Sequence, residues 1–325
     1  MPEAPRQWLI VGSGAIALRH IECASTLTDG ARFARLSSSG ASARCPEIDD
    51  RVETVLSDWE SALNWEPDVA VVANAAVGHV PALEHLIQAR VPTLVEKPLS
   101  NSLESVAGLA TSVSRSGVPV VIGYCLRFHP AVRRVVQLVE GGDIGQPILY
   151  RAHVGQHIDD WRATPSEDSV SLSPEMGGGA LLELSHEIDL ALWLMGEPSE
   201  VAGIAIGADS SAVEMAASLQ IRHADGMSSI SMNMLERPAM RQLSVIGTRG
   251  SVHADLIAGR AYWADDEGAV NQMETSRDED MYLEQMRHFI ACARGDETPM
   301  VDIFAATRVL TCIDAVRGAP QGSAP

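Results

Sequence analysis

The chain has 325 residues, of which 46% are hydrophobic and 21% are charged, and its formal net charge is −19. This length favours two domains over a single hydrophobic core. The acidic excess argues against a nucleic-acid partner, because a phosphate backbone requires a basic protein surface. No run of about 18 apolar residues is present, so no membrane-spanning helix is expected. The N-terminus carries no signal-peptide pattern, which favours a cytoplasmic protein.

The numbers and positions of the cysteine and lysine residues further limit the possible classes of protein. The five cysteines are scattered and form no CxxC pair, which argues against a disulfide framework or a structural zinc site. Of the 24 basic residues, 23 are arginine and only Lys97 is lysine. Arginine cannot release its proton near neutral pH, so the one position that keeps lysine is a candidate for proton transfer. A biased coding composition is the alternative explanation.

Strand and helix patterns alternate through the first 123 residues. Short apolar segments are each followed by a helical one, which predicts a doubly wound parallel sheet of the Rossmann type. We expect strands at residues 7–11, 32–37, 69–74, 91–98 and 118–124, and helices ending near 26 and covering 58–64, 79–90 and 102–115.

The pattern changes after Tyr124. Short alternating segments at hairpin spacing between about 200 and 265 predict an open, mostly antiparallel sheet. The predicted domains are therefore 1–123 and 124–325, the second an α/β domain whose last residues form a disordered tail. We expect a strand at 148–155 and helices at 130–140, 180–195, 280–294 and 302–317.

A glycine-rich turn follows the first predicted strand. Gly12, Gly14 and Ala17 fit the pattern G-x-G-x-x-A in the required order of strand, turn and helix. The first glycine permits the turn, the second lets the backbone approach a pyrophosphate, and the helix that begins near Ala15 and Ile16 faces the anion with its N-terminus. The turn therefore predicts dinucleotide binding, with a purely structural glycine turn as the alternative.

The end of the second strand bears on the choice of dinucleotide. An NAD-binding domain carries Asp or Glu there, because a carboxylate binds the ribose 2′-hydroxyl. Here Ser37 and Ser38 follow the strand, and Arg44 lies further along. Hydroxyl groups and an arginine suit a 2′-phosphate better, so NADP(H) is favoured over NAD(H). Arg44 as a solvated loop residue is the alternative.

Lys97 lies in a Glu96-Lys97-Pro98 segment, where a predicted parallel strand ends. That is the edge at which open α/β sheets bind ligands. A lysine there can exchange a proton with a substrate hydroxyl or carbonyl group. A cis peptide bond before Pro98 would fix the direction of the lysine. An ion pair with Glu96 or a phosphate contact is the alternative role.

His186 follows a run of three glycines, Gly177–Gly179, on a predicted helix. Glu183, three residues earlier, shares the face of His186 if the helix is continuous. A histidine beside a carboxylate can act in acid–base chemistry or anchor a hydroxyl group. Glu187 and Asp189 lie close by, but no second cluster of ligands supports a metal, so none is expected.

Four segments in sequence order carry a family resemblance: residues 12–20 (GSGAIALRH), 74–79, 95–100 (VEKPLS) and 177–189 (GGGALLELSHEID). Together they resemble the Gfo/Idh/MocA family of glucose–fructose oxidoreductase and inositol dehydrogenase-like enzymes, over nearly the whole chain. The resemblance implies a Rossmann domain followed by an α/β domain whose open sheet often forms the interface of a dimer or tetramer.

The resemblance also implies roles for single residues. The family lysine matched by Lys97 and the histidine matched by His186 contact the reacting hydroxyl group. The usual family aspartate lies four residues before the histidine, whereas this chain has Glu183 three residues before it, which makes Glu183 the third catalytic candidate. The residues expected beside the cofactor are Gly12, Gly14, Ala15, Ile16, Ser37, Ser38, Arg44, Asn74, Ala75, His79, Glu96 and Lys97.

The SHEID letters, with GYCLRFHP at 123–130 and VGQHIDDWR at 154–162, resemble one branch of the family. That branch is associated with bacterial surface sugars, including sialic-acid-like sugars. The substrate contacts it implies are Arg127, His157, Trp161 and Arg162. An arginine can hold a carboxylate or phosphate through two hydrogen bonds. A structural ion pair is the alternative for either arginine.

These observations predict an NAD(P)-dependent sugar dehydrogenase or reductase that transfers a hydride between the nicotinamide and a sugar carbon. Lys97 would exchange the proton of the reacting hydroxyl group, and His186 would orient that group. Two alternatives stay open: a redox-neutral enzyme that cleaves glycosides with transient use of its cofactor, and a regulator that binds sugar and NADP without catalysis. The sequence identifies neither the sugar, nor the carbon, nor the direction of the reaction.

Overall fold

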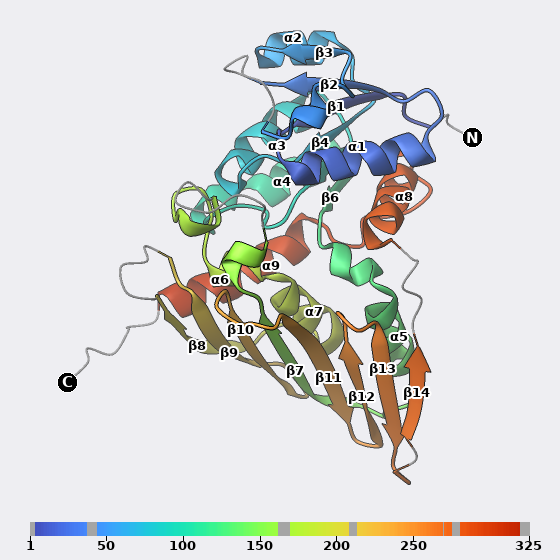
Figure 1. Ribbon diagram of the computed structural model, residues 1–325, viewed down its shortest axis with the longest axis vertical. Coiled ribbons are helices and arrows are strands. Elements are labelled where there is room, and N and C mark those ends of the chain that lie inside the picture. The colour runs from blue at the N-terminus through green and yellow to red at the C-terminus, as the bar shows by residue number, and fades with distance from the viewer. Residues whose placement is uncertain are drawn as a thin grey trace, which may run out of the picture. The chain divides into compact units, whose positions relative to one another are not determined.

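The computed structural model describes residues 4–37, 44–161, 170–207, 213–268, 270–274 and 280–318. The chain divides into two compact units, each with its own sheet (Figure 1). The first unit comprises Met1–Cys125 and Tyr282–Thr307, and the second unit comprises Leu126–Met281 and Arg308–Pro325.

Six strands form the sheet of the first unit: β1 (Gln7–Val11), β2 (Arg32–Leu36), β3 (Thr54–Leu56), β4 (Val69–Val72), β5 (Thr93–Val95) and β6 (Val120–Ile122). All are parallel, in the order β3-β2-β1-β4-β5-β6. This is the strand order of the doubly wound Rossmann fold. β4 is apolar and buried along its whole length, as expected for a parallel strand with helices on both faces of the sheet.

Helices cover this sheet through apolar side chains. The helices are α1 (Ala15–Leu27), α2 (Trp59–Asn64), α3 (His79–Gln88), α4 (Leu109–Ser116), α8 (Met281–Ala293) and the start of α9 (Ile303–Arg317). Trp8 of β1 packs against Phe33 of β2 and Phe289 of α8, with ring centroids 6.3 and 6.1 Å apart. Ile21 of α1 joins the same buried cluster, so α1 and α8 pack against one core.

Eight strands form the sheet of the second unit: β7 (Pro147–Gly155), β8 (Glu200–Ile206), β9 (Ala216–Arg222), β10 (Met227–Asn233), β11 (Met240–Gly247), β12 (Gly250–Asp255), β13 (Arg260–Asp265) and β14 (Val270–Glu274). Their order is β14-β13-β12-β11-β7-β10-β9-β8. Only β7 and β10 pair in parallel, and every other described pair in this sheet is antiparallel.

Helices lie against one face of this second sheet. α5 (Pro130–Glu140) packs on β12 and β13, α6 (Ala180–Glu183) packs on β9 and β10, and α7 (His186–Met195) packs on β7 and β10. Side chains alternate accordingly along β9, where Leu219 is buried and its neighbours Ser218 and Gln220 are exposed. The exposed positions define the open face of the sheet. Short 3₁₀ helices lie at Pro46–Ile48, Ala76–Gly78, Glu104–Val106, Cys125–Phe128, Ile158–Asp160 and Val170–Leu172.

The two-sheet α/β architecture confirms the predicted fold class, and several details differ from the prediction. The boundary falls after Cys125 rather than residue 123, and Tyr282–Thr307 joins the first unit, although the sequence placed it in the second. The reason is that Met286 and Phe289 of α8 are buried in the core of the first unit, a long-range contact that no local pattern reveals. The expected helix at 102–115 is a 3₁₀ turn followed by α4, and β3 and β14 were not predicted.

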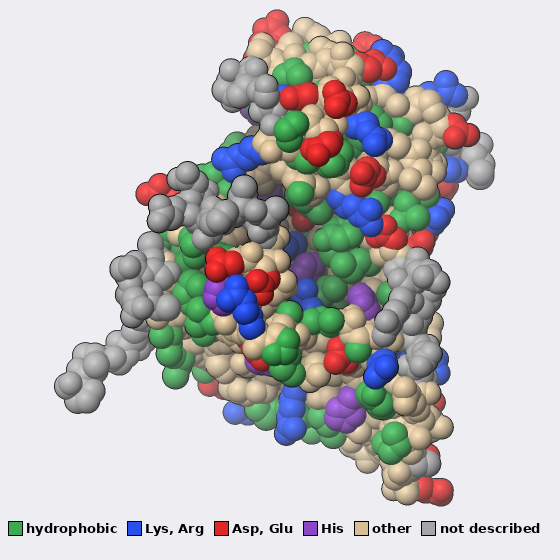
Figure 2. All heavy atoms as spheres, in the orientation of Figure 1, with side chains coloured by type: hydrophobic (Ala, Val, Ile, Leu, Met, Phe, Trp, Pro, Cys, Tyr) green, Lys and Arg blue, Asp and Glu red, His purple; other side chains and the backbone are tan. Residues whose placement is uncertain are grey.

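The charged side chains on the surface can be compared with the net charge of the sequence. On the visible face of the first unit, acidic and arginine side chains are interspersed, so the net charge of −19 is not gathered into one acidic patch there (Figure 2). Among the described residues, no helix has both the length and the apolar composition needed to cross a membrane.

Candidate functional site

The glycine turn lies between β1 and α1. Gly12 has φ +145°, and a Cβ there would lie 2.4 Å from the carbonyl oxygen of Ala73, so only glycine fits. Gly14 caps α1, and a Cβ at Gly14 would meet nothing within 4 Å. The first backbone amides of the helix, those of Ala15 and Ile16, carry the positive end of its dipole. The turn therefore leaves room for an anionic group, and it fits the pyrophosphate of a dinucleotide.

Lys97 follows β5 at the carboxyl edge of the same parallel sheet. Its side chain is partly exposed, and the peptide bond between Lys97 and Pro98 is cis. The glycine turn and the Asn74–Ala75 segment follow the carboxyl ends of β1 and β4, which lie in order beside β5. The fold thus brings these predicted cofactor residues and Lys97 to one edge of the sheet.

Glu96, the residue before Lys97, has a buried carboxylate. Its Oε1 lies 2.7 Å from Nε2 of His20 on α1, and its Oε2 accepts the backbone N–H of Lys97 at 3.2 Å. Burial alone raises the pKa of such a carboxyl group. The hydrogen bond with His20 and the charge of Lys97 overcome that effect and hold the pKa of Glu96 below its usual value. Glu96 is therefore an anion at the base of the Lys97 segment.

His79 links two loops at this edge. Its Nδ1 lies 2.8 Å from the carbonyl oxygen of Pro98, and its Nε2 lies 3.0 Å from that of Asn74. Burial lowers the pKa of His79, although both backbone contacts raise it. Both ring nitrogens lie within hydrogen-bond distance of a backbone carbonyl group, so His79 connects the loop after β4 to the loop after β5.

His186, in the second unit, is buried and is the first residue of α7. The continuous helix expected over 180–195 is wrong, because Leu184 and Ser185 separate α6 from α7. Glu183 and His186 therefore do not share one helical face. Glu183 instead accepts a hydrogen bond from the hydroxyl group of Ser171.

Two buried carboxylates follow His186 on α7. Glu187 accepts hydrogen bonds from Nε and Nη2 of Arg241 on β11, at 2.7 and 3.0 Å. Asp189 accepts hydrogen bonds from Nε and Nη2 of Arg127, at 2.9 and 2.7 Å. These two ion pairs fix α7 to β11 and to the segment that leads into α5.

Arg127 was a predicted substrate contact, with a structural ion pair as the alternative. Its guanidinium group is buried, pairs with Asp189 and lies 4.8 Å from the ring centroid of Trp193. Burial raises the pKa of Asp189, and the charge of Arg127 opposes that rise. The geometry supports the structural role of Arg127.

The remaining predicted site residues each contact different neighbours. His157 caps the 3₁₀ helix Ile158–Asp160, and its Nδ1 lies 3.4 Å from the Asp159 carboxylate. Trp161 follows that turn. The Ser37 amide donates to Leu56, and Arg44 is exposed. Ser38 and Arg162 lie outside the described residues.

Sequence reasoning missed His20 and Arg241, although both hold carboxylates beside the residues proposed for the chemistry. His20 is the last residue of the GSGAIALRH segment, but its partner Glu96 lies 76 residues away. Arg241 lies 54 residues from Glu187. A pattern within one segment cannot reveal such pairs.

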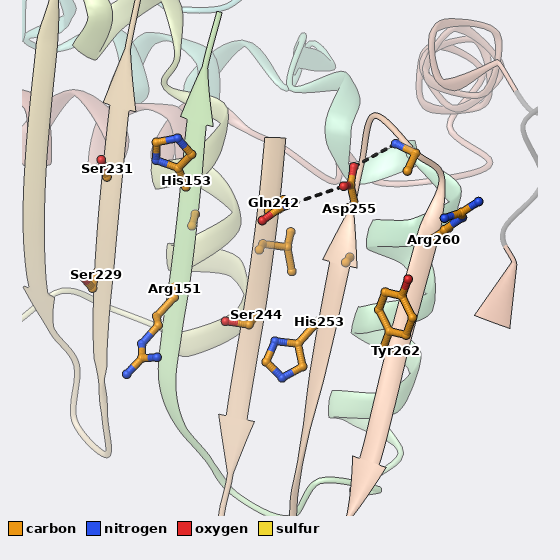
Figure 3. A pocket seen from close by; sticks show the side chains of 14 residues that line it. Arg151, His153, Ser229, Ser231, Gln242, Ser244, His253, Asp255, Arg260 and Tyr262 are labelled. Atoms are coloured by element: carbon orange, nitrogen blue, oxygen red, sulfur yellow. Dashed lines mark hydrogen bonds between the residues drawn. The ribbon is translucent and has the colours of Figure 1, made fainter. Parts of the chain in front are cut away.

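A cavity of about 530 Å³ lies on the second sheet. Figure 3 shows Arg151, His253 and Tyr262 projecting from β7, β12 and β13 at this cavity. Asp255 accepts hydrogen bonds from the side chain of Gln242 and the backbone of Ala258. None of the predicted site residues is among those that line the cavity. In the described part of the chain, including this cavity, no group of three or more His, Cys, Asp or Glu residues could hold a metal ion.

The glycine turn and the two sheets define an α/β protein with an NAD(P)-binding Rossmann domain and a mixed-sheet second domain. Two family models match this chain: the oxidoreductase family with an NAD-binding Rossmann fold over residues 6–124, and the GFO/IDH/MocA C-terminal domain over residues 132–253. The chain belongs to the GFO/IDH/MocA oxidoreductase family.

Curated relatives include inositol 2-dehydrogenase of Mycolicibacterium smegmatis, 29% identical over 203 residues, which are 61% of this chain and 54% of the relative. The uncharacterized oxidoreductase YrbE of Bacillus subtilis is 27% identical over 197 residues, which are 59% of this chain and 54% of that protein. The chain therefore spans about half the length of these curated relatives.

Solved structures share the fold. An oxidoreductase domain protein from Kribbella flavida aligns with a TM-score of 0.86 and 17% identity, covering 98% of this chain and 96% of its own. Levoglucosan dehydrogenase in complex with NADH and levoglucosan aligns with a TM-score of 0.85 and 18% identity, covering 96% of each chain. At these identities the likeness concerns the fold alone.

The buried Arg127–Asp189 pair yields a stability prediction. Arg127→Met should lower the free energy of unfolding by about 3–5 kcal/mol, because it leaves a buried carboxylate without its partner. Combining it with Asp189→Leu removes both charges and should recover part of that loss. Arg237→Met is the matched control, since Arg237 holds Asp160 through two bonds on the exposed surface, and it should change little. Urea unfolding measures all three, and equal losses for Arg127→Met and Arg237→Met would contradict the structural role.

Proposed function

We propose that the protein is an NAD(P)-dependent oxidoreductase that transfers a hydride between the nicotinamide and a carbon of a sugar or polyol. The observation that carries this proposal is the position of Lys97, the second residue after β5, with its backbone N–H held by Glu96. Ligands of open α/β sheets bind at this carboxyl edge. Relatives named as inositol and D-xylose dehydrogenases support the substrate class.

The dinucleotide, when bound, accepts or supplies a hydride at C4 of its nicotinamide ring. In the oxidation direction, the Lys97 amine takes the proton of the reacting hydroxyl group as the hydride leaves the same carbon, so that a carbonyl group forms and Lys97 becomes an ammonium ion. His186 orients the hydroxyl group by a hydrogen bond. Reduction reverses these steps.

We favour NADP(H) as the dinucleotide. No acidic residue stands between Ser37 and Arg44, so nothing in that stretch repels a 2′-phosphate. Hydroxyl groups and a guanidinium group suit a phosphate, because both donate hydrogen bonds to its oxygens. The SHEID segment supports a surface-sugar derivative as the substrate. The engagement of Arg127 with Asp189 removes one of the two arginines proposed to hold an acidic group on that sugar.

We also propose that the open face of the second sheet forms the interface of a homo-oligomer. This face carries a mixture of charges and apolar groups, including the exposed Arg151 and Met227 and the half-buried Asp255. A symmetric interface pairs such a face with itself, so opposite charges and apolar groups can meet across it. The polar cavity of Figure 3 would then be enclosed between two copies.

Lys97→Arg tests the proton-transfer role. Arginine keeps the charge and cannot release the proton, so turnover should fall by about 10²–10⁴-fold while dinucleotide affinity stays nearly unchanged. The measurement is net NADPH formation or consumption with a panel of sugars and polyols. Near-normal turnover of the variant would refute the role of Lys97. Wild-type turnover without net redox change would instead support glycoside cleavage, and dinucleotide binding without any turnover would support a regulator.

Arg44→Ala tests the choice of dinucleotide. Loss of the guanidinium group should raise the KM for NADP⁺ about tenfold, the effect of one charge-assisted hydrogen bond, and leave the KM for NAD⁺ unchanged. Arg51→Ala is the matched control, since Arg51 is an exposed arginine of the same unit. Equal effects of Arg44→Ala on both dinucleotides would exclude a phosphate contact.

Ser231→Arg tests the oligomer. Ser231 is an exposed residue of β10 on the open face, and a long cation there should separate the copies. Light scattering after size exclusion should show a smaller mass for this variant. Ser112→Arg, on the exposed surface of α4, is the control and should leave the mass unchanged. A wild-type monomer, or an unchanged mass for Ser231→Arg, would overturn this interface.

A further inference from the structure

His20 is a fully buried histidine on the helix that follows the glycine turn. The relative exposure of His20 is 0%, and the residue lies on the second turn of α1 after Gly14. Its Nε2 lies 2.7 Å from Oε1 of Glu96. The other oxygen of the same carboxylate accepts the backbone N–H of Lys97 at 3.2 Å. One carboxylate thus joins α1 to the backbone of the only lysine.

The surroundings leave Glu96 little freedom to move. A Cβ at Gly123, the residue after β6, would lie 3.1 Å from Glu96 Oε1 and 3.2 Å from its Cα, so the Glu96 side chain packs closely against this glycine. On the other side, the ring of Tyr282 meets the His20 ring edge to face, with centroids 6.3 Å apart. A carboxylate that is packed in this way and largely shielded from water depends on its protein donors.

The contacts of His20 identify its donor nitrogen. Its Nδ1 is buried and has no hydrogen-bond partner among the described residues. A hydrogen on Nε2 is donated to Glu96, so His20 acts as a fixed donor at that nitrogen.

We propose that His20 is a positioning residue for Lys97, acting through Glu96. The contact couples the helix that faces the dinucleotide to the segment that bears the proton-transferring amine. Without the His20 donor, the Glu96 carboxylate would turn toward other donors or water, and the Lys97 backbone would lose its acceptor. This inference rests on the proposed function for its catalytic consequence, but the contact itself can be tested without turnover.

The contact is measurable because Lys97 is the only lysine. Selective ¹⁵N-lysine labelling of the full chain gives a single backbone amide signal, that of Lys97. His20→Leu should move this signal and speed its hydrogen exchange, whereas His20→Gln, whose amide nitrogen replaces Nε2 as donor, should restore both. An unmoved signal in His20→Leu would overturn the proposal, whatever the enzyme does.

The chain offers a matched control for stability. His288 on α8 is also a buried histidine of the first unit, and its Nδ1 lies 2.5 Å from Oε2 of Glu297. His288→Leu should lower the melting temperature as His20→Leu does, and leave the Lys97 amide signal and kcat unchanged. If His288→Leu also moves that signal and lowers kcat, the effect of His20→Leu is general destabilisation and the proposal is wrong.

Turnover provides the second readout. His20→Leu should lower kcat by about 100-fold, the cost of a misplaced catalytic group, with the dinucleotide Kd changed less than about threefold. In a Lys97→Ala background the same substitution should cause no further loss, because its effect passes through Lys97. An equal loss in both backgrounds, or a loss confined to dinucleotide affinity, would refute the positioning role. Absence of wild-type turnover with any sugar or polyol would overturn the proposed function, and the amide signal would still decide whether His20 sets the Lys97 backbone.

Discussion

A carboxylate removed from water is stable only where donors replace its hydration, and at the end of β5 this requirement organises the edge of the first sheet. Glu96 meets it with one donor from α1, His20, and one from the backbone of its own neighbour, Lys97. The helix that begins at the glycine turn and the segment that bears the lysine are therefore held by the same group. The glycine-turn helix and Lys97, the residue proposed for proton transfer, are thus linked through one carboxylate within the first unit.

The second unit repeats the arrangement with different partners. His186 directly precedes Glu187, as Lys97 directly follows Glu96, and Glu187 is also buried. Here arginine supplies the donors, since Arg241 binds both oxygens of Glu187. In each unit, the residue proposed for the chemistry is thus the chain neighbour of a buried, paired carboxylate. Such pairs add little net stability to the fold, because desolvation of the two charges offsets much of their attraction. They do fix the orientation of the side chains that form them.

Local chemistry explains which parts of this molecule the sequence could predict. The strand–turn–helix order and the two glycines predicted the dinucleotide turn, because Gly12 and Gly14 act through their own backbone and immediate neighbours. The helix break at Leu184–Ser185 was missed, since no glycine or proline marks it in the sequence. The docking of α8 on the first unit was also missed, because Phe289 and Trp8 lie far apart in the chain. Pairings over such separations follow from the fold and cannot be read within a segment.

Arginine and lysine occupy sites with different chemical requirements in this protein. A guanidinium group presents two parallel N–H bonds to a carboxylate and stays charged when buried, so arginine suits the sites at Asp189 and Glu187. Those positions need a permanent cation with fixed direction, and lysine would supply neither two parallel bonds nor a planar group to stack on Trp193. At the edge of the first sheet, the role we propose for Lys97 has the opposite need: a cation beside Glu96 that can exchange its proton. Arginine cannot meet this need because it does not release its proton near neutral pH, so the proposed role gives the single lysine a chemical reason.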